Sequence, residues 1–307
     1  MMHHILYSFK LIFKNWKIFL PFLLIMVLVA ILFAGLMSEN TYQELQTTLD
    51  KAAAENDVNI NTFAKSGLLL ISTIFTGGLM RESAEVTGIF TVLIFLIIWL
   101  TTIFILRHKM AGHEVKLRDG LYNAMAPLIS TFVVLVVAAI QAIPIILLIV
   151  AYSAAIETHF LDTPFYALLF LGFAGLMILL SSYLLSGTIM ALTAVSAPGL
   201  YPMVALKNAS ELMRGRRIKF VLRIIALLVI LVVMWAIVMM PLIMFDLFMK
   251  QFEWTYQIPF IPVCLVVMTC FTMMYATTYF YTYYRWLLDF SFEEEKFSKR
   301  KPKKGKQ

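Results

Sequence analysis

The histidines and acidic residues of this chain do not have the spacing of a hydrolytic metal site. His113 and Glu114 follow His108, but a zinc protease needs two histidines one turn apart on a helix, with the glutamate between them. An ordinary loop is the better interpretation, and a metal site there is a remote alternative. The polar residues at 157–162 predict a solvated turn. We therefore expect no enzyme activity and no catalytic, metal or cofactor site.

Polar residues inside the apolar segments are the second source of chemistry. An ionisable residue deep in a membrane is a functional hypothesis by default, but Arg223, Asp246 and Arg285 fall near segment ends. We expect Arg223 to reach the lipid headgroups along its flexible stem. Neutral polar residues are more central in the segments, and we expect them to pack between helices. The alternative is that they line a pathway for a solute. These residues are Gln141, Ser182, Ser186, Thr269, Thr272, Tyr275 and Tyr279.

Long apolar segments position these residues. The chain is 61% hydrophobic, whereas soluble domains contain about 45–50% apolar residues. A helix needs about 20 residues to cross the hydrocarbon core, and six segments are long enough: 17–38, 86–107, 124–151, 165–193, 218–247 and 259–286. We predict an all-α integral membrane protein with one polytopic domain over residues 1–290. Pro144 and Pro241 should kink or unwind their helices.

The charge of the loops alternates along the chain and predicts the orientation. The N-terminal arm, the second and fourth loops and the tail hold 21 of the 25 Lys and Arg residues. Because Lys and Arg resist translocation, we expect both termini in the cytoplasm and the protein in the cell membrane. The basic tail 291–307 should be disordered. Since the positive charge is confined to membrane edges, we expect no nucleic-acid partner.

The first external loop, 39–85, is the one sizeable segment predicted outside the membrane on that side. Its polar stretch 39–65 reads as an exposed acidic helix, and residues 67–80 are apolar but too short to cross. A seventh span there would invert every later loop and destroy the charge alternation. We therefore predict an interfacial or re-entrant segment.

A short amphipathic segment precedes each odd-numbered span. We expect these three segments to lie in the cytoplasmic interface, with apolar residues facing the membrane and basic residues at anionic headgroups. The fold would then be three helical hairpins, each entered through an interfacial helix. The residues predicted to contact headgroups are Lys10, Lys14, Lys17, Lys116, Arg118, Lys207, Arg214, Arg216, Arg217 and Lys219.

Residues 193–230 resemble a family of six-span membrane domains related to the membrane part of glycerophosphodiester phosphodiesterases. The positions that carry the resemblance are Gly199, Ala205, Leu206, Ala209 or Ser210, Leu212 and Gly215. The resemblance implies a six-span protein of unassigned activity. The phosphodiesterases carry their chemistry in a following TIM barrel of about 200 residues or more. The chain stops about 20 residues after its last span, so that activity is not expected here.

Together these patterns predict a non-enzymatic membrane protein that binds lipids or scaffolds a membrane complex, with membrane lipids and a membrane-protein partner as its contacts. The alternative is a transporter or permease subunit for a hydrophobic or amphipathic solute, because repeated hairpins and proline-broken helices occur in transporters. An intramembrane enzyme ranks third.

Overall fold

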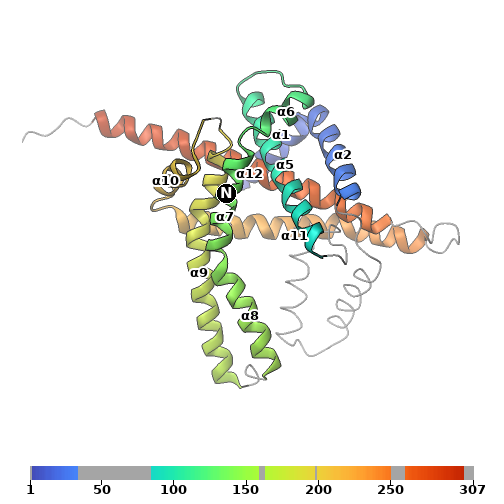
Figure 1. Ribbon diagram of the computed structural model, residues 1–307, viewed down its shortest axis with the longest axis vertical. Coiled ribbons are helices and arrows are strands. Elements are labelled where there is room, and N and C mark those ends of the chain that lie inside the picture. Colours follow the sequence, from blue (N-terminus) through green and yellow to red (C-terminus); the bar gives the residue numbers. More distant parts are fainter. Residues whose placement is uncertain (1, 34–83, 159–162, 198, 250–259, 301–307) are drawn as a thin grey trace, which may run out of the picture. The chain divides into compact units, whose positions relative to one another are not determined.

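The computed structural model describes residues 2–33, 84–158, 163–197, 199–249 and 260–300, and every regular element in these ranges is an α-helix (Figure 1). The predicted all-α class is confirmed for this part of the chain. The helices are α1 (Met2–Lys14), α2 (Trp16–Phe33), α5 (Ala84–Met110), α6 (Leu117–Ala124), α7 (Leu128–Gln141), α8 (Ile143–Glu157), α9 (Pro164–Ala194), α10 (Pro202–Leu212), α11 (Arg217–Met249) and α12 (Phe260–Arg300). The segments predicted at 39–65 and 67–80 lie outside the described residues.

Four of these helices, α5, α9, α11 and α12, are long and apolar enough to cross a membrane. Two further candidates are bent pairs: α1 with α2, at 90°, and α6 with α7, at 62°. If each bent pair is one span, the described part of the chain has up to six. In length and composition, these helices suit a multi-pass membrane protein.

The helices gather into two compact units. The first unit contains Met1–Met125 and Ala226–Tyr279, and the second contains Ala126–Ile225 and Phe280–Gln307. The sequence does not reveal this division, because α11 and α12 each contribute one part to each unit without a break in the helix.

In the first unit, α5 packs against α2 and α6. The ring of Phe9 on α1 contacts the rings of Phe271 and Tyr275 on α12. The indole nitrogen of Trp235 donates a hydrogen bond of 2.9 Å to the hydroxyl of Thr272, which joins α11 to α12. The apolar core around this bond consists of Trp235, Met239, Ile261, Leu265 and Met268.

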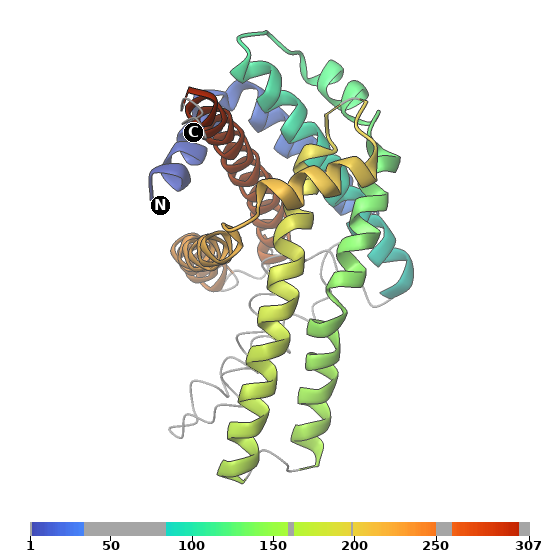
Figure 2. The same cartoon turned by 90° about the vertical axis from the view of Figure 1, so that its left-hand side faces the viewer.

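In the second unit, α7 and α8 follow one another beside α9, and α10 packs against α9 and α7 (Figure 1 and Figure 2). The helix breaks at Ala142, as Pro144 predicts. Proline has no backbone N–H to donate to the carbonyl four residues earlier. The N–H of Ile145 then bonds to the carbonyl of Ala142 at 3.0 Å instead of that of Gln141. The break is thus a local shift of the hydrogen-bonding register.

Three further sequence predictions, which concern helix ends and prolines, can be compared with the structure. Pro164 is in the first turn of α9, as expected, but the side chain of Thr163 makes no capping hydrogen bond. Helix α11 continues through Pro241, so the predicted unwinding does not occur there. Helix α12 runs to Arg300, which corrects the prediction of a disordered tail for residues 291–300. The Glu and Lys residues of this stretch are good helix formers, and they extend the apolar helix.

A basic pocket at the turn between α10 and α11

The turn between α10 and α11 brings several basic side chains close together. Helix α10 ends at Leu212 and α11 begins at Arg217. Gly215 between them has φ +74°, a left-handed conformation that side chains with a Cβ rarely adopt. The chain can therefore reverse within a few residues, which places Arg214 and Arg217 on either side of one glycine.

Small residues hold α10 against α9. Ala205, Ala209 and Met213 are buried and recur every four residues, so they form one stripe of the helix. A Cβ at Gly187 of α9 would lie 3.8 Å from Cα of Ser210, which shows how closely the two helices approach. Met203, near the start of α10, is 69% exposed and lies outside this stripe.

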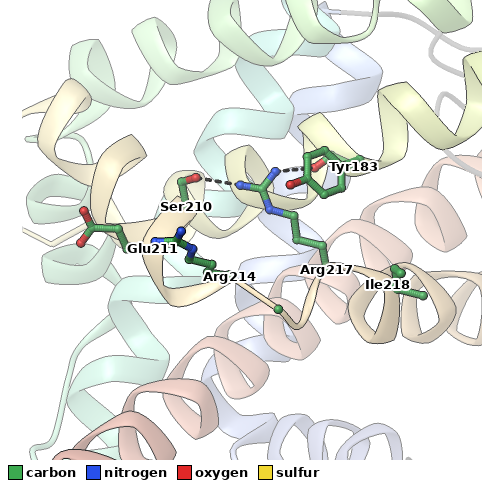
Figure 3. Close-up of a pocket in the computed structure, with 7 residues that line it drawn as sticks. Tyr183, Ser210, Glu211, Arg214, Arg217 and Ile218 are labelled. Carbon is green, nitrogen blue, oxygen red and sulfur yellow. Dashed lines mark hydrogen bonds between the residues drawn. The ribbon is translucent and has the colours of Figure 1, made fainter.

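A pocket of about 420 Å³ opens at this turn (Figure 3). Its residues come from the last third of α9, the end of α10, the turn and the start of α11. They are Tyr183, Ser210, Glu211, Arg214, Gly215, Arg217 and Ile218. All belong to the second unit.

Arg217 is fixed in the pocket by three contacts. Its Nη2 donates to Oγ of Ser210 at 2.8 Å, and its Nη1 donates to the backbone carbonyl of Tyr183 at 3.3 Å. The guanidinium also lies over the ring of Tyr183, 4.2 Å from the centroid. A guanidinium carries five N–H donors, so donors remain for a ligand after these two bonds. The group is therefore positioned before any ligand arrives.

The other groups make the pocket a net positive site. Arg214 and Glu211 are exposed at its rim, so the lining carries two guanidinium groups and one carboxylate. The first turn of α11 adds backbone N–H groups without partners inside the helix, and the positive end of the helix dipole. Anions with several oxygens, such as phosphate, match this combination. No histidine, cysteine or paired acid is among the lining residues of this pocket.

Two neighbouring arginines lie on aromatic rings of α12. Arg216 lies over Phe290, 4.5 Å from the ring centroid. Arg223 lies over Tyr283 at 4.7 Å and Trp286 at 5.1 Å, and its Nη1 is buried without a hydrogen-bond partner. Aromatic rings of the same unit therefore hold the guanidinium of Arg223; that it reaches the headgroups stays a prediction.

The basic residues predicted at the interface fall into several groups. Of these basic residues, Arg214 and Arg217 line the pocket, and the others do not. Arg216 and Arg217 are partly buried. The others are exposed: Lys10 and Lys14 on α1, Lys17 at the start of α2, Lys116 just before α6, Arg118 on α6, Lys207 on α10, Arg214 in the turn and Lys219 at the start of α11.

The polar residues predicted inside the spans divide between the two units, with Gln141, Ser182 and Ser186 in the second and Thr269, Thr272, Tyr275 and Tyr279 in the first. Ser182 is partly buried, whereas Thr269, Tyr275 and Tyr279 are buried. Ser186 donates to the carbonyl of Tyr183 in its own helix at 2.7 Å.

Gln141 joins the broken span to α9. Thr188 donates to its side-chain oxygen, and Ser181 donates to its backbone carbonyl at 2.9 Å. That carbonyl is the one released by the register shift at Ala142. The contacts of Gln141 and the Trp235–Thr272 bond both support packing between helices.

Sequence reasoning assigned no binding role to Tyr183 or Ser210, the two residues that hold Arg217 in the pocket. Ser210 lies within the segment that carries the family resemblance, but nothing in its spacing indicates a bond to Arg217. Tyr183 lies 34 residues before Arg217, and only the packing of α9 against α10 brings it near. No local pattern could have found it.

Comparisons with known proteins leave the geometry as the basis for function. A scan against protein-family models gives no match, and searches of curated proteins and solved structures give no significant match. The described residues contain no group of three or more His, Cys, Asp or Glu side chains that could hold a metal ion.

Proposed function

We propose that this protein is a non-enzymatic, lipid-binding protein of the cell membrane whose pocket between α10 and α11 holds an anionic lipid headgroup. In this proposal the chain crosses the membrane six times as three hairpins. Each hairpin is entered through an interfacial amphipathic helix, α1, α6 or α10, and both termini are cytoplasmic. The observation that carries the proposal is the fixed guanidinium of Arg217 beside Arg214 in one pocket.

The position of the pocket along α11 agrees with a headgroup ligand. Arg217 is the first residue of α11 and also the first residue of its apolar stretch, which runs from Arg217 to Asp246. A ligand held there lies at the end of a span, where the polar headgroups border the hydrocarbon core. A basic residue near an anionic membrane surface contributes about 1 kcal/mol to attraction. Hydrogen bonds from a fixed guanidinium to phosphate oxygens add to this.

The broken span does not favour transport. Interrupted helices in transporters often expose backbone groups that bind a substrate. Here Ser181 and Thr188 of α9 bond to the backbone carbonyl and side chain of Gln141. Because the helix behind the break occupies these groups, the break serves to join α7 and α8 to α9.

The first prediction tests the pocket by native mass spectrometry of the full chain, released from nanodiscs that contain equal phosphatidylglycerol and phosphatidylcholine. Arg217→Gln should lower the amount of retained phosphatidylglycerol about tenfold, the effect of losing roughly 1.4 kcal/mol. Arg214→Gln should lower it less, because its side chain is exposed and less ordered. Lys219→Gln is the matched control: it removes an equal charge two residues away, outside the pocket lining.

Equal loss in Arg217→Gln and Lys219→Gln would show that only the general positive charge attracts lipid, and would overturn the pocket assignment. Because Arg217 also holds Tyr183 and Ser210, each variant is checked for unchanged helicity and elution volume. Turnover of a supplied phospholipid by the purified protein would contradict the non-enzymatic proposal.

A further inference from the structure

A second cavity lies within the first unit, between α2, α5 and α6. Its volume is about 1030 Å³. The walls are apolar, and include Ile25 and Val29 of α2, Ile97 of α5 and Leu121 of α6. Two charged side chains, Arg118 and Asp119 of α6, also line it, and both are exposed. The cavity therefore combines an apolar interior with one cation and one anion.

Close packing of α6 on α5 sets the position of the charged pair. Gly120 is buried, and a Cβ there would lie 3.3 Å from Cγ1 of Ile105. Ala124, one turn further along α6, is also buried. Because these two small residues face α5, Arg118 and Asp119 are directed to the open side of α6.

The apolar side of the cavity is built from three helices. On α2, Ile25 and Val29 are one turn apart and so lie on one face, and both line the cavity. Ile97 of α5 and Leu121 of α6 also line it. Together these side chains form an apolar groove beside the charged pair of α6.

We propose that this groove binds one phospholipid with a primary-amine headgroup, of the phosphatidylethanolamine class. One acyl chain lies along Ile25, Val29 and Ile97. Arg118 bonds to the phosphate, and Asp119 accepts hydrogen bonds from the ammonium group. The inference rests on the proposed function only in placing α6 at the membrane interface; it does not depend on the α10–α11 pocket.

The charge pair selects this ligand class over the other common headgroups. Asp119 disfavours an acidic headgroup, because a second negative charge would face its carboxylate. A choline headgroup has no N–H to donate to that carboxylate. A primary ammonium satisfies the aspartate while the phosphate satisfies the arginine, so both charges find partners at one ligand.

The second prediction tests the groove by native mass spectrometry of the full chain, released from nanodiscs with equal phosphatidylethanolamine, phosphatidylcholine and phosphatidylglycerol. The wild type should retain one phosphatidylethanolamine at least fivefold above phosphatidylcholine. Ile25→Trp should fill the groove and lower this retention at least fivefold. Leu24→Trp is the matched control, since Leu24 is also exposed on α2 but is not among the lining residues.

Asp119→Asn tests the headgroup without altering the groove. It should bring retention of the ethanolamine and choline lipids within twofold of each other. Glu114→Gln, which removes an exposed acid outside the lining, should leave the preference unchanged. Equal retention of the two lipids by the wild type, or equal effects of the two tryptophans, would overturn the proposal. Arg217→Gln separates the two sites: it should lower phosphatidylglycerol and leave phosphatidylethanolamine unchanged.

Discussion

At the scale of single residues, arginines in this protein are placed by aromatic rings as well as by hydrogen bonds. Arg217 lies over Tyr183, Arg216 over Phe290, and Arg223 over Tyr283 and Trp286. A guanidinium is weakly hydrated and planar, so it stacks on rings more readily than an ammonium does. Aromatic rings thus help to position cations near the ends of apolar helices.

The third prediction concerns the energetic coupling between Arg223 and Trp286. A double-mutant cycle of Arg223→Met and Trp286→Leu should give a favourable coupling of about 0.5–2 kcal/mol, because the contact is sheltered from water. The measurement is the free energy of unfolding in detergent. A parallel cycle of Arg223→Met with Trp16→Leu should show no coupling, since Trp16 is 55% exposed and is not one of the rings over which Arg223 lies. Equal coupling in both cycles would contradict the cation–π assignment.

At the scale of elements, the α7–α8 break and α9 act together. Pro144 shifts the hydrogen-bonding register and releases a carbonyl, and α9 supplies the donor that occupies it. Inside a membrane an unpaired backbone group costs several kcal/mol. The position of Ser181 on α9 is thus part of what makes the break tolerable.

The fourth prediction tests the side-chain bond at this break. Thr188→Val should lower the free energy of unfolding by about 0.6–1.7 kcal/mol, the range measured for hydrogen bonds between membrane helices. The double variant Gln141→Leu with Thr188→Val should lose less than the sum of the two single changes, because neither partner is then left unpaired. Thr158→Val is the control, because Thr158 bonds only to the carbonyl of Ala154 in the preceding helix turn. Purely additive losses would show that the two side chains do not interact.

At the scale of the whole molecule, the spans differ greatly in burial. In the most apolar stretch of α12, 67% of the residues are buried, whereas in that of α9 only 6% are. Buried threonines and tyrosines of α12, such as Thr269, Tyr275 and Thr278, therefore pack within the protein. Most of α9, by contrast, is not buried by other parts of this chain.

The fifth prediction tests the proposed topology in cells, using variants in which Cys264 and Cys270 are replaced by alanine. A membrane-impermeant thiol reagent should label Thr158→Cys from outside. It should label Lys10→Cys, Lys116→Cys and Lys207→Cys only after the cytoplasmic face is opened. The reason is that basic segments remain on the cytoplasmic side. Labelling of Lys116→Cys and Thr158→Cys from the same side would overturn the hairpin arrangement.

Much of the helix pattern could be predicted from hydropathy and prolines. Residues 165–193 and 218–247 closely match α9 and α11, and Pro144 marks the break at Ala142. Pro241 does not, because α11 continues past it. The same residue type thus has two outcomes in this chain, which the sequence around each proline does not distinguish.

The candidate site was predictable only in part. The cluster of basic residues at 214–219 indicates a headgroup surface, but it does not distinguish Arg217 from Lys219. Only the structure shows that one is held by Ser210 and Tyr183 and the other is exposed.

The sequence by itself determined that this is a helical protein with membrane-spanning segments, and where basic residues border them. Hydropathy and charge act on each segment separately through the bilayer, so they can be read along the chain. The tertiary structure decided which arginine is fixed in a pocket, which helix is buried, and which hydroxyl donates a hydrogen bond to the Gln141 carbonyl at the break. These depend on how each helix is rotated and aligned against its neighbour. That is set by contacts between residues as far apart as Tyr183 and Arg217.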